Sequence, residues 1–244
     1  MGLTPTLAGD LGAQELAALL PDRAIRTYPA ALSSEVDALG WARSDAPHGA
    51  VVVAEYQAAP RGRGGLEWHP SPGRGLIFSM VLRFKQLAVK DGWLWLAAGT
   101  AVADVLGDET RTHWPDELWA GGARAASVNV QVDAPTIVQW AVVSVFVEDA
   151  RPPRAPLLAA LAQAIEQRTA SSATPVAAAY GRRCRTLGRT VRARLVPMGP
   201  AGEEIVGEAL SVRPDGSLVI EAGTETLERR AIIPPSSLGL LSEE

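Results

Sequence analysis

The sequence predicts a fold in two parts, a larger part that mixes helices with strands and a smaller part made of strands alone. Before residue 170, apolar runs typical of buried strands alternate with segments in which apolar residues recur at helical spacing. After Gly181 the chain changes to short β segments separated by turns. Four or five strands in about 60 residues favour a small barrel.

Local patterns place the elements of the larger part in order. A weak helical pattern at residues 14–20 is followed by a short strand at residues 25–28. Ser33-Ser34-Glu35 then precedes a helical pattern at residues 36–43, and a serine followed by an acid favours a helix start. The later elements expected here are strands at residues 51–54, 76–84, 126–132 and 136–147, and helices at residues 92–106 and 157–168.

The smaller part is expected to contain β segments at residues 190–195, 204–213, 217–221 and 226–233. Pro214-Asp215-Gly216 separates the second segment from the third and is typical of a tight hairpin turn. Residues 171–175, which are small and polar and end in a proline, are the best candidate for the boundary between the parts. We therefore predict two domains, residues 1–178 and 179–244.

Composition excludes several classes of protein. A hydrophobic content of 47% with 20% charged residues predicts a buried core, and the net charge of −4 argues against nucleic-acid partners. The apolar runs at residues 93–103 and 137–147 are shorter than the roughly 20 residues that cross a membrane. The single cysteine, Cys184, and the absence of a secretory signal favour a cytoplasmic protein. Three histidines and one cysteine predict no zinc site.

The loop after the strand at residues 51–54 is the most informative segment. It carries two arginines, Arg61 and Arg63, among three glycines, Gly62, Gly64 and Gly65. Arginine provides permanent charge and forked donors suited to carboxylate or phosphate, while glycine lets the backbone approach a ligand. The loop therefore predicts an anion or nucleotide site, although a solvated surface loop explains the same residues equally well.

The same loop resembles the adenylate loop of the biotin–protein ligases, within the wider biotin/lipoate ligase superfamily. That loop reads Ala-Glu-x-Gln-x-x-Gly-Arg-Gly-Arg-x-Gly-Arg-x-Trp, and Pro60 and Leu66 replace its first glycine and last arginine. The residues that match in register are Ala54, Glu55, Gln57, Arg61, Gly62, Arg63, Gly65 and Trp68. Trp114-Pro115-Asp116-Glu117-Leu118 is similar to the family's Lys-Trp-Pro-Asn-Asp-Leu segment. With the tail, the resemblance covers roughly residues 25–238.

The resemblance implies an α+β fold in which helices pack on a mixed β-sheet, followed by a small SH3-like β-barrel. It also implies that biotin and ATP, with Mg²⁺, form biotinyl-5′-AMP, whose acyl group passes to a lysine of a biotin carboxyl carrier domain. No nucleic acid or membrane is expected as a partner. Some relatives form homodimers, so a monomer or a homodimer is expected, and an N-terminal DNA-binding segment has no room here.

The resemblance also assigns residues to the site. Arg61 and Arg63 would contact phosphate and carboxylate, Gln57 would contact biotin, and Arg124 takes the place of the family's catalytic lysine. Asp116 would lie near the nucleotide or the metal. The other ligand contacts that it implies are Ser33, Ser34, Gly62, Trp68 and Trp114. For Trp68 and Trp114, packing in the core is the competing interpretation.

Departures from the family pattern cluster at this site and leave three interpretations open. Acids replace asparagines at Glu35, Asp116 and Glu148, and Glu117 replaces an aspartate. Ser127 and Phe146 replace glycines. The three interpretations are an active biotin ligase, a ligase for another carboxylate such as lipoate, and a binding protein without catalysis. Since Arg63 lies between glycines, we expect it to make few core contacts, so that Arg63→Ala would abolish adenylation with little loss of stability.

Overall fold

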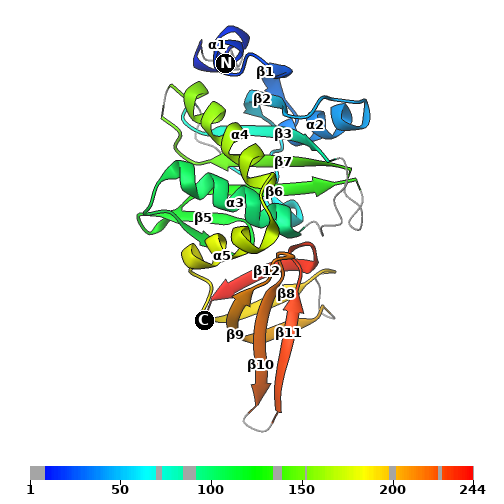
Figure 1. Ribbon diagram of the computed structural model, residues 1–244, viewed down its shortest axis with the longest axis vertical. Coiled ribbons are helices and arrows are strands. Elements are labelled where there is room, and N and C mark those ends of the chain that lie inside the picture. Colours follow the sequence, from blue (N-terminus) through cyan, green and yellow to red (C-terminus); the bar gives the residue numbers. More distant parts are fainter. Residues whose placement is uncertain are drawn as a thin grey trace.

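The computed structural model describes residues 9–69, 73–84, 92–133, 139–151, 153–197, 202–224 and 227–243. Two sheets lie one beyond the other along the molecule's longest axis, with most of the helices around the first (Figure 1). The first residues described form a short 3₁₀ turn, Gly9–Leu11, and helix α1, Ala13–Leu19. In the described part of the chain, no helix is long and apolar enough to span a membrane.

The larger sheet has seven strands in the order β1-β2-β3-β7-β6-β5-β4. Its strands are β1 (Ile25–Ala31), β2 (Ala50–Gln57), β3 (Leu76–Arg83), β4 (Arg111–His113), β5 (Glu117–Ala120), β6 (Ala123–Val132) and β7 (Trp140–Val147). Only β1 and β2 run parallel, and every other neighbouring pair is antiparallel. The expected mixed sheet is therefore confirmed, while β4 and β5 are additions that the sequence did not predict.

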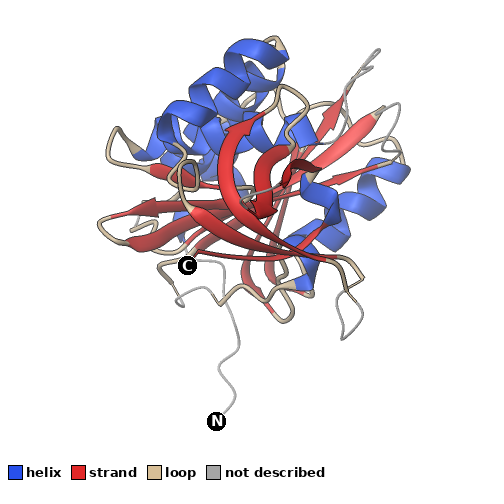
Figure 2. Ribbon diagram, turned by 90° about the horizontal axis from the view of Figure 1, so that it is seen from below, coloured by secondary structure: helices blue, strands red, loops and turns tan. Residues whose placement is uncertain are grey.

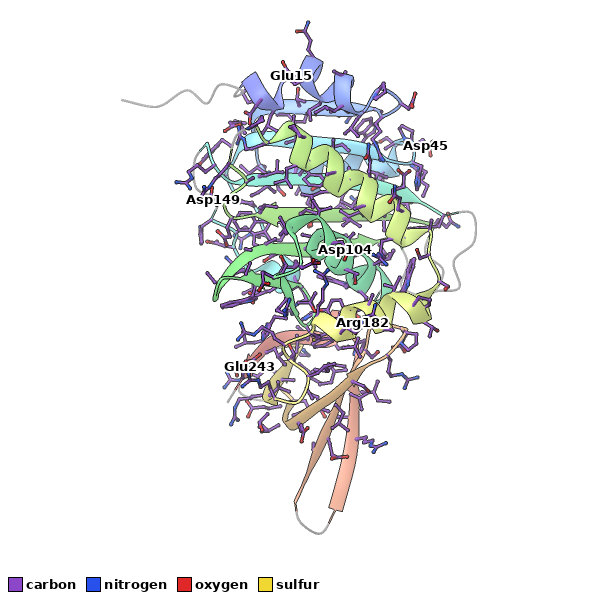
Figure 3. All side chains as sticks on the ribbon, turned by 60° about the vertical axis from the view of Figure 1, so that its left-hand side comes forward. Glu15, Asp45, Asp104, Asp149, Arg182 and Glu243 are labelled. Carbon is purple, nitrogen blue, oxygen red and sulfur yellow. The ribbon has the colours of Figure 1, made fainter. Side chains whose placement is uncertain are left out.

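One face of this sheet is covered by helices α3 (Gly92–Leu106) and α4 (Ala155–Thr169). Helix α3 is buried over most of its length, which explains why nearly all its residues are small or apolar. Trp93 and Trp95 belong to this core, as expected. Figure 3 shows α4 and α3 side by side in front of the sheet, with Asp104 labelled on α3.

The opposite face carries helix α2 (Ser34–Arg43), which covers only one end of the central strands. Ser33 caps this helix as expected, because its Oγ accepts a hydrogen bond from the backbone N–H of Glu35 at 3.2 Å. The other end of the face is covered by the loop after β2, which contains a 3₁₀ turn at Arg63–Gly65. Polar side chains of the central strands lie between these two covers.

The smaller sheet is antiparallel, with its five strands in the order β11-β10-β9-β8-β12. Figure 2 views the molecule from below, from the end at which this sheet lies. Its strands are β8 (Thr190–Leu195), β9 (Glu204–Val212), β10 (Leu218–Thr224), β11 (Leu227–Ile233) and β12 (Leu238–Glu243), with a 3₁₀ turn, Pro235–Ser237, before β12. The sequence did not predict β12. Helix α5 (Ala173–Arg183) starts inside the expected boundary segment, and residue 178 lies within it. The division at that residue remains a prediction.

The two parts meet at the predicted hairpin turn. The turn carrying Asp215 and Gly216 presses against the first residue of α3, so that a Cβ added to Gly216 would lie 2.1 Å from the carbonyl oxygen of Gly92. Only glycine fits such an approach, and Gly216 also has a φ of 87°. The indole Nε1 of Trp114 donates to the Gly216 carbonyl at 2.9 Å. Trp114 thus packs between the two parts.

Candidate functional site

The Arg/Gly loop closes on itself as a narrow hairpin. Arg61 and Glu67 face each other across it, and the Gly62 N–H donates to the Leu66 carbonyl at 2.7 Å. The guanidinium of Arg61 folds back to the Gly65 carbonyl at 2.9 Å and to Glu67 at 3.0 Å. Its side chain is 51% exposed. Arg61 is therefore a cation at the solvent-exposed surface of the loop. An anion that approaches from solvent can reach it.

Trp68 holds the base of the loop against the sheet. Its ring lies 5.5 Å from that of Phe146, and both side chains are buried with Ile77. A Cβ added to Gly62 would lie 2.5 Å from the Trp68 Nε1, so this position of the loop accepts only glycine. The packing interpretation of Trp68 fits these contacts. Phe146, which replaces a glycine of the family pattern, fills the space beneath it.

Arg63 does not extend into solvent, and the expectation that it makes few core contacts is wrong. Its Nε donates to the Asp116 carboxylate at 3.0 Å, and its Nη1 donates to the carbonyl oxygens of Leu238 and Gly239 at 2.6 and 3.2 Å. The Arg63 side chain is only 8% exposed. Burial raises the pKa of Asp116, while the neighbouring Arg63 lowers it. Arg63 thus ties the loop to the residue that precedes β5 and to β12.

A chain of buried hydrogen bonds links α2 to the central strands. The backbone N–H of Ser34 donates to the Gln57 Oε1 at 2.8 Å, and the Ser34 Oγ lies 2.8 Å from that of Ser79. Ser79 in turn lies 2.9 Å from the Oγ of Ser144, its partner on the neighbouring strand. The structure therefore brings together Gln57, which the resemblance assigns to biotin, and Ser34, which it assigns to the ligand site.

Glu35 completes this chain from the first turn of α2. Its Oε2 accepts hydrogen bonds from the Asn129 Nδ2 at 2.7 Å and from the Ser144 Oγ at 3.0 Å. Burial raises the pKa of Glu35, and the two hydrogen bonds offset this only in part. The Glu35 carboxylate therefore lies between α2, β6 and β7. It does not extend into solvent from the first turn of the helix.

Arg124 is paired with two acids. Its Nε and Nη2 donate to the Glu148 Oε1 at 2.9 and 2.8 Å, and its Nη1 lies 3.5 Å from Glu117. The guanidinium carbon of Arg124 lies 5.9 Å from the centre of the Phe146 ring. The charge of Arg124 is therefore next to the aromatic residues beneath the loop. A hydrogen bond with His113 is the main cause that lowers the pKa of Glu117 to about 2. His113 of β4 also lies 2.9 Å from Glu243 of β12, which is labelled in Figure 3, so this contact joins the two sheets.

Most residues assigned by the resemblance gather on or beside one face of the larger sheet, between α2 and the loop. Trp114 is turned toward the smaller sheet, and Ser33 serves as a helix cap. Sequence reasoning did not single out Asn129, although a signal existed. Ser127 and Asn129 are polar residues at alternate positions of an apolar strand, which places both on one face.

The site offers cations and hydrogen-bond donors rather than a metal-binding cluster. Within the described ranges, no group of three or more His, Cys, Asp or Glu residues is arranged to hold a metal ion. Cys184 is a buried free thiol at the C-terminal end of α5. The arrangement can therefore neutralise anions and orient a polar ligand.

Comparison with known proteins decides the family. Residues 30–147 match the model of the biotin/lipoate A/B protein ligase family. The biotin–[acetyl-CoA-carboxylase] ligase of Mycobacterium tuberculosis is 31% identical over 222 residues, which cover 80% of this chain and 82% of that protein. The chain is a biotin–protein ligase family member.

Solved structures of biotin–protein ligases share the fold. The Aquifex aeolicus ligase in complex with biotin and ATP superposes with a TM-score of 0.69 at 18% identity, over 91% of this chain and 99% of that one. A biotin protein ligase-like protein of unknown function from Silicibacter sp. TM1040 gives a TM-score of 0.59 at 16% identity, over 86% and 94% of the two chains. These two similarities establish the two-part α+β fold of the ligase.

Proposed function

We propose that this biotin–protein ligase activates biotin with ATP to biotinyl-5′-AMP and transfers the biotinyl group to a lysine of a biotin carboxyl carrier domain. One observation carries the proposal. The buried Ser34–Gln57 pair and the Arg124 guanidinium lie on the same face of a sheet whose other face carries the main apolar core. That face can hold a polar ring at one end and an anionic carboxylate at the other.

The chemistry requires charge neutralisation more than a protein nucleophile. A carboxylate oxygen of biotin attacks the α-phosphorus of ATP, and pyrophosphate leaves. The lysine amine of the carrier then attacks the acyl carbon, and AMP leaves. Since both reactants of the first step are anions, nearby cations lower its barrier. Arg124 supplies such a charge in place of a lysine, although its planar fork sets other distances than an ammonium group.

The other assigned residues take supporting roles in this proposal. Gln57 and Ser34 orient biotin, and the exposed Arg61 meets the phosphates. Arg63, held by Asp116, positions the loop, while Gly62 and Trp68 keep the loop close to the sheet. Glu148 and Glu117 form ion pairs with the Arg124 guanidinium, so the anionic groups of the ligands compete with these two carboxylates for its N–H donors. A site with a lysine that has no acidic partner would lack this competition.

The proposal also covers the metal ion, the cellular location and the protein partner of the reaction. Mg²⁺ would arrive with ATP, held mainly by the phosphate oxygens, because the described residues form no metal cluster of their own. A cytoplasmic location is proposed on the single unpaired cysteine, Cys184. The protein partner is a carrier domain, and the oligomeric state is a monomer or a homodimer.

Calorimetric titration with biotin, then with ATP and Mg²⁺, followed by pyrophosphate release and biotin transfer to a carrier domain, tests the proposal. Arg124→Ala should lower pyrophosphate release by about 100-fold or more, as loss of an electrostatic contact in an active site does. Arg182→Ala, which removes an exposed arginine of α5, should leave it unchanged. Biotin binding without pyrophosphate would point to a binding protein, and no binding would overturn the proposal.

A further inference from the structure

Buried polar atoms on the α2 side of the larger sheet lack partners. Among the described residues, the Asn129 Oδ1 and the Ser127 Oγ are buried and accept or donate no hydrogen bond. Both residues are 1% exposed. The Glu35 Oε1 likewise has no hydrogen-bond partner in the described part of the chain, although Oε2 has two. Unmet groups of this kind cost stability and are rare in folded proteins.

The geometry of β6 points these groups toward one place. Residues two apart on a strand face the same side, so Ser127 and Asn129 share the side opposite to Val128. Val128 belongs to the core beneath α3 and α4. Ser127 and Asn129 therefore face the side covered by α2 and the loop, and Glu35 reaches Asn129 from α2 at 2.7 Å.

The hydrogen-bond chain fixes which atoms remain available. The Asn129 Nδ2 is used by Glu35, so its Oδ1 is left as an acceptor. The Glu35 Oε2 is likewise used, so its Oε1 is left as an acceptor. The same chain runs on through Ser144 and Ser79 to the Ser34–Gln57 pair. This chain therefore connects the free acceptors to Gln57, the residue assigned to biotin.

We propose that Glu35 and Asn129 form a specificity-determining pair that accepts hydrogen bonds from N–H groups of the acyl substrate. The inference rests on the proposed function, and it specifies which chemical group of the acyl substrate the site recognises. The cyclic urea of biotin carries two N–H donors, whereas the dithiolane of lipoate carries none. Binding lipoate would leave the buried Asn129 Oδ1 unmet and the Glu35 Oε1 without a donor. Sites built to hydrogen-bond a substrate strongly reject analogues that lack the group.

The decisive variant is Glu35→Gln. Glutamine has the same shape and keeps one oxygen for Asn129 and Ser144, but it sets an NH₂ donor where the free acceptor was. In calorimetric titrations, biotin and dethiobiotin, which keeps the urea without the ring sulfur, should each bind at least 10-fold more weakly to the variant than to the wild type. Lipoate should bind the wild type at least 100-fold more weakly than biotin, and the variant should change this affinity less than threefold.

Asp37→Asn is the matched control, because it removes an acid from the same first turn of α2 and should leave all three affinities unchanged. A second measurement changes the ligand instead of the protein. Biotin methylated on a urea nitrogen should bind the wild type at least 10-fold more weakly than biotin does, and the loss should be much smaller for Glu35→Gln. Circular dichroism checks folding.

Two results would overturn the inference while leaving the proposed function intact. Either Glu35→Gln weakens biotin and lipoate equally, or methylation of the urea has no effect on biotin binding to the wild type. A wild-type protein that binds no biotin at all would instead overturn the proposed function, and the inference with it. The wild-type titration with biotin therefore separates the two failures.

Discussion

The two faces of the larger sheet are built from the same strands but are chemically opposite. On the α3 and α4 side, Phe78, Val128 and Val145 belong to one continuous apolar core. On the other side, the next residues along the strands include Ser79, Asn129 and Ser144, joined by hydrogen bonds to each other or to Glu35. The period of two along a strand is enough to separate stability from ligand recognition within one layer.

The difference between the two faces indicates where substitutions in this ligase should affect its stability and where they should affect ligand binding. The apolar face gains its stability from close packing, so any loss of volume there costs free energy. The polar face gives up apolar burial and keeps unmet acceptors, which stabilise the fold little but can recognise a ligand. Substitutions of neighbouring residues should therefore have unlike effects.

The largest effect is expected for Phe78→Ala on the apolar face. Removing this fully buried ring should lower the free energy of unfolding by roughly 3–5 kcal/mol, as measured by urea denaturation. Ser79→Ala, one residue further on, deletes one hydroxyl from the polar face and should cost only about 1 kcal/mol. Equal losses for the two variants would contradict the division of the sheet.

Arg63→Ala should come next, and here the effect falls on stability and on catalysis together. It removes a buried cation that binds Asp116 and two backbone carbonyls, so we expect a loss of about 3 kcal/mol together with loss of adenylate formation. Arg61→Ala is the control for stability, since that side chain is half exposed and should cost about 0.5 kcal/mol or less. An Arg63→Ala protein with an unchanged melting temperature would show that the tie to β12 contributes nothing.

A pH-dependent effect of intermediate size is expected for Glu117→Gln. Because the fold lowers the pKa of Glu117 to about 2, its carboxylate should make the wild type more stable than the variant above about pH 4.5. The gap should be on the order of 2 kcal/mol at pH 7 and should shrink as the pH falls from about 4.5 toward 2. Urea unfolding at pH 7, 5 and 3 measures it, and a gap of constant size would refute the assignment.

The smallest effect has the opposite sign and belongs to Glu35. Its pKa is raised, so the stability of the wild type is greatest below the ordinary pKa and falls as the pH rises through the raised value. Glu35→Gln should therefore be more stable than the wild type at pH 7, by about 0.5–1 kcal/mol, with no difference near pH 4. A variant less stable at pH 7 would mean that Glu35 supports the fold rather than the ligand.

Much of the fold could be predicted because the signals are local. The helix expected at residues 92–106 is present over Gly92–Leu106, and the turn at residues 214–216 joins β9 to β10. Helix α5 was missed because its first turn contains Pro175 and resembles a linker, although proline is tolerated there. Strands β4 and β5 are too short to show an alternating pattern.

The site was harder to predict, since its contacts join distant parts of the chain. The resemblance identified Ser34 and Gln57, which the structure places in contact. Arg63 was interpreted from its glycine neighbours, yet its partners Asp116 and Leu238 lie 53 and 175 residues away. Local pattern carries no information about such partners, so the structural role of Arg63 could only come from the folded molecule.

The close seating of the hairpin turn on the first residue of α3 limits how this enzyme can move. The backbones of Gly92 and Gly216 are in direct contact, and Trp114 is hydrogen-bonded across the junction. These contacts leave no room for a hinge motion between the two parts. The ligase therefore has to admit and release its reactants without rocking one part against the other. The loop at residues 61–68 belongs to the same rigid junction, because Arg63 binds the carbonyl oxygens of Leu238 and Gly239 in β12.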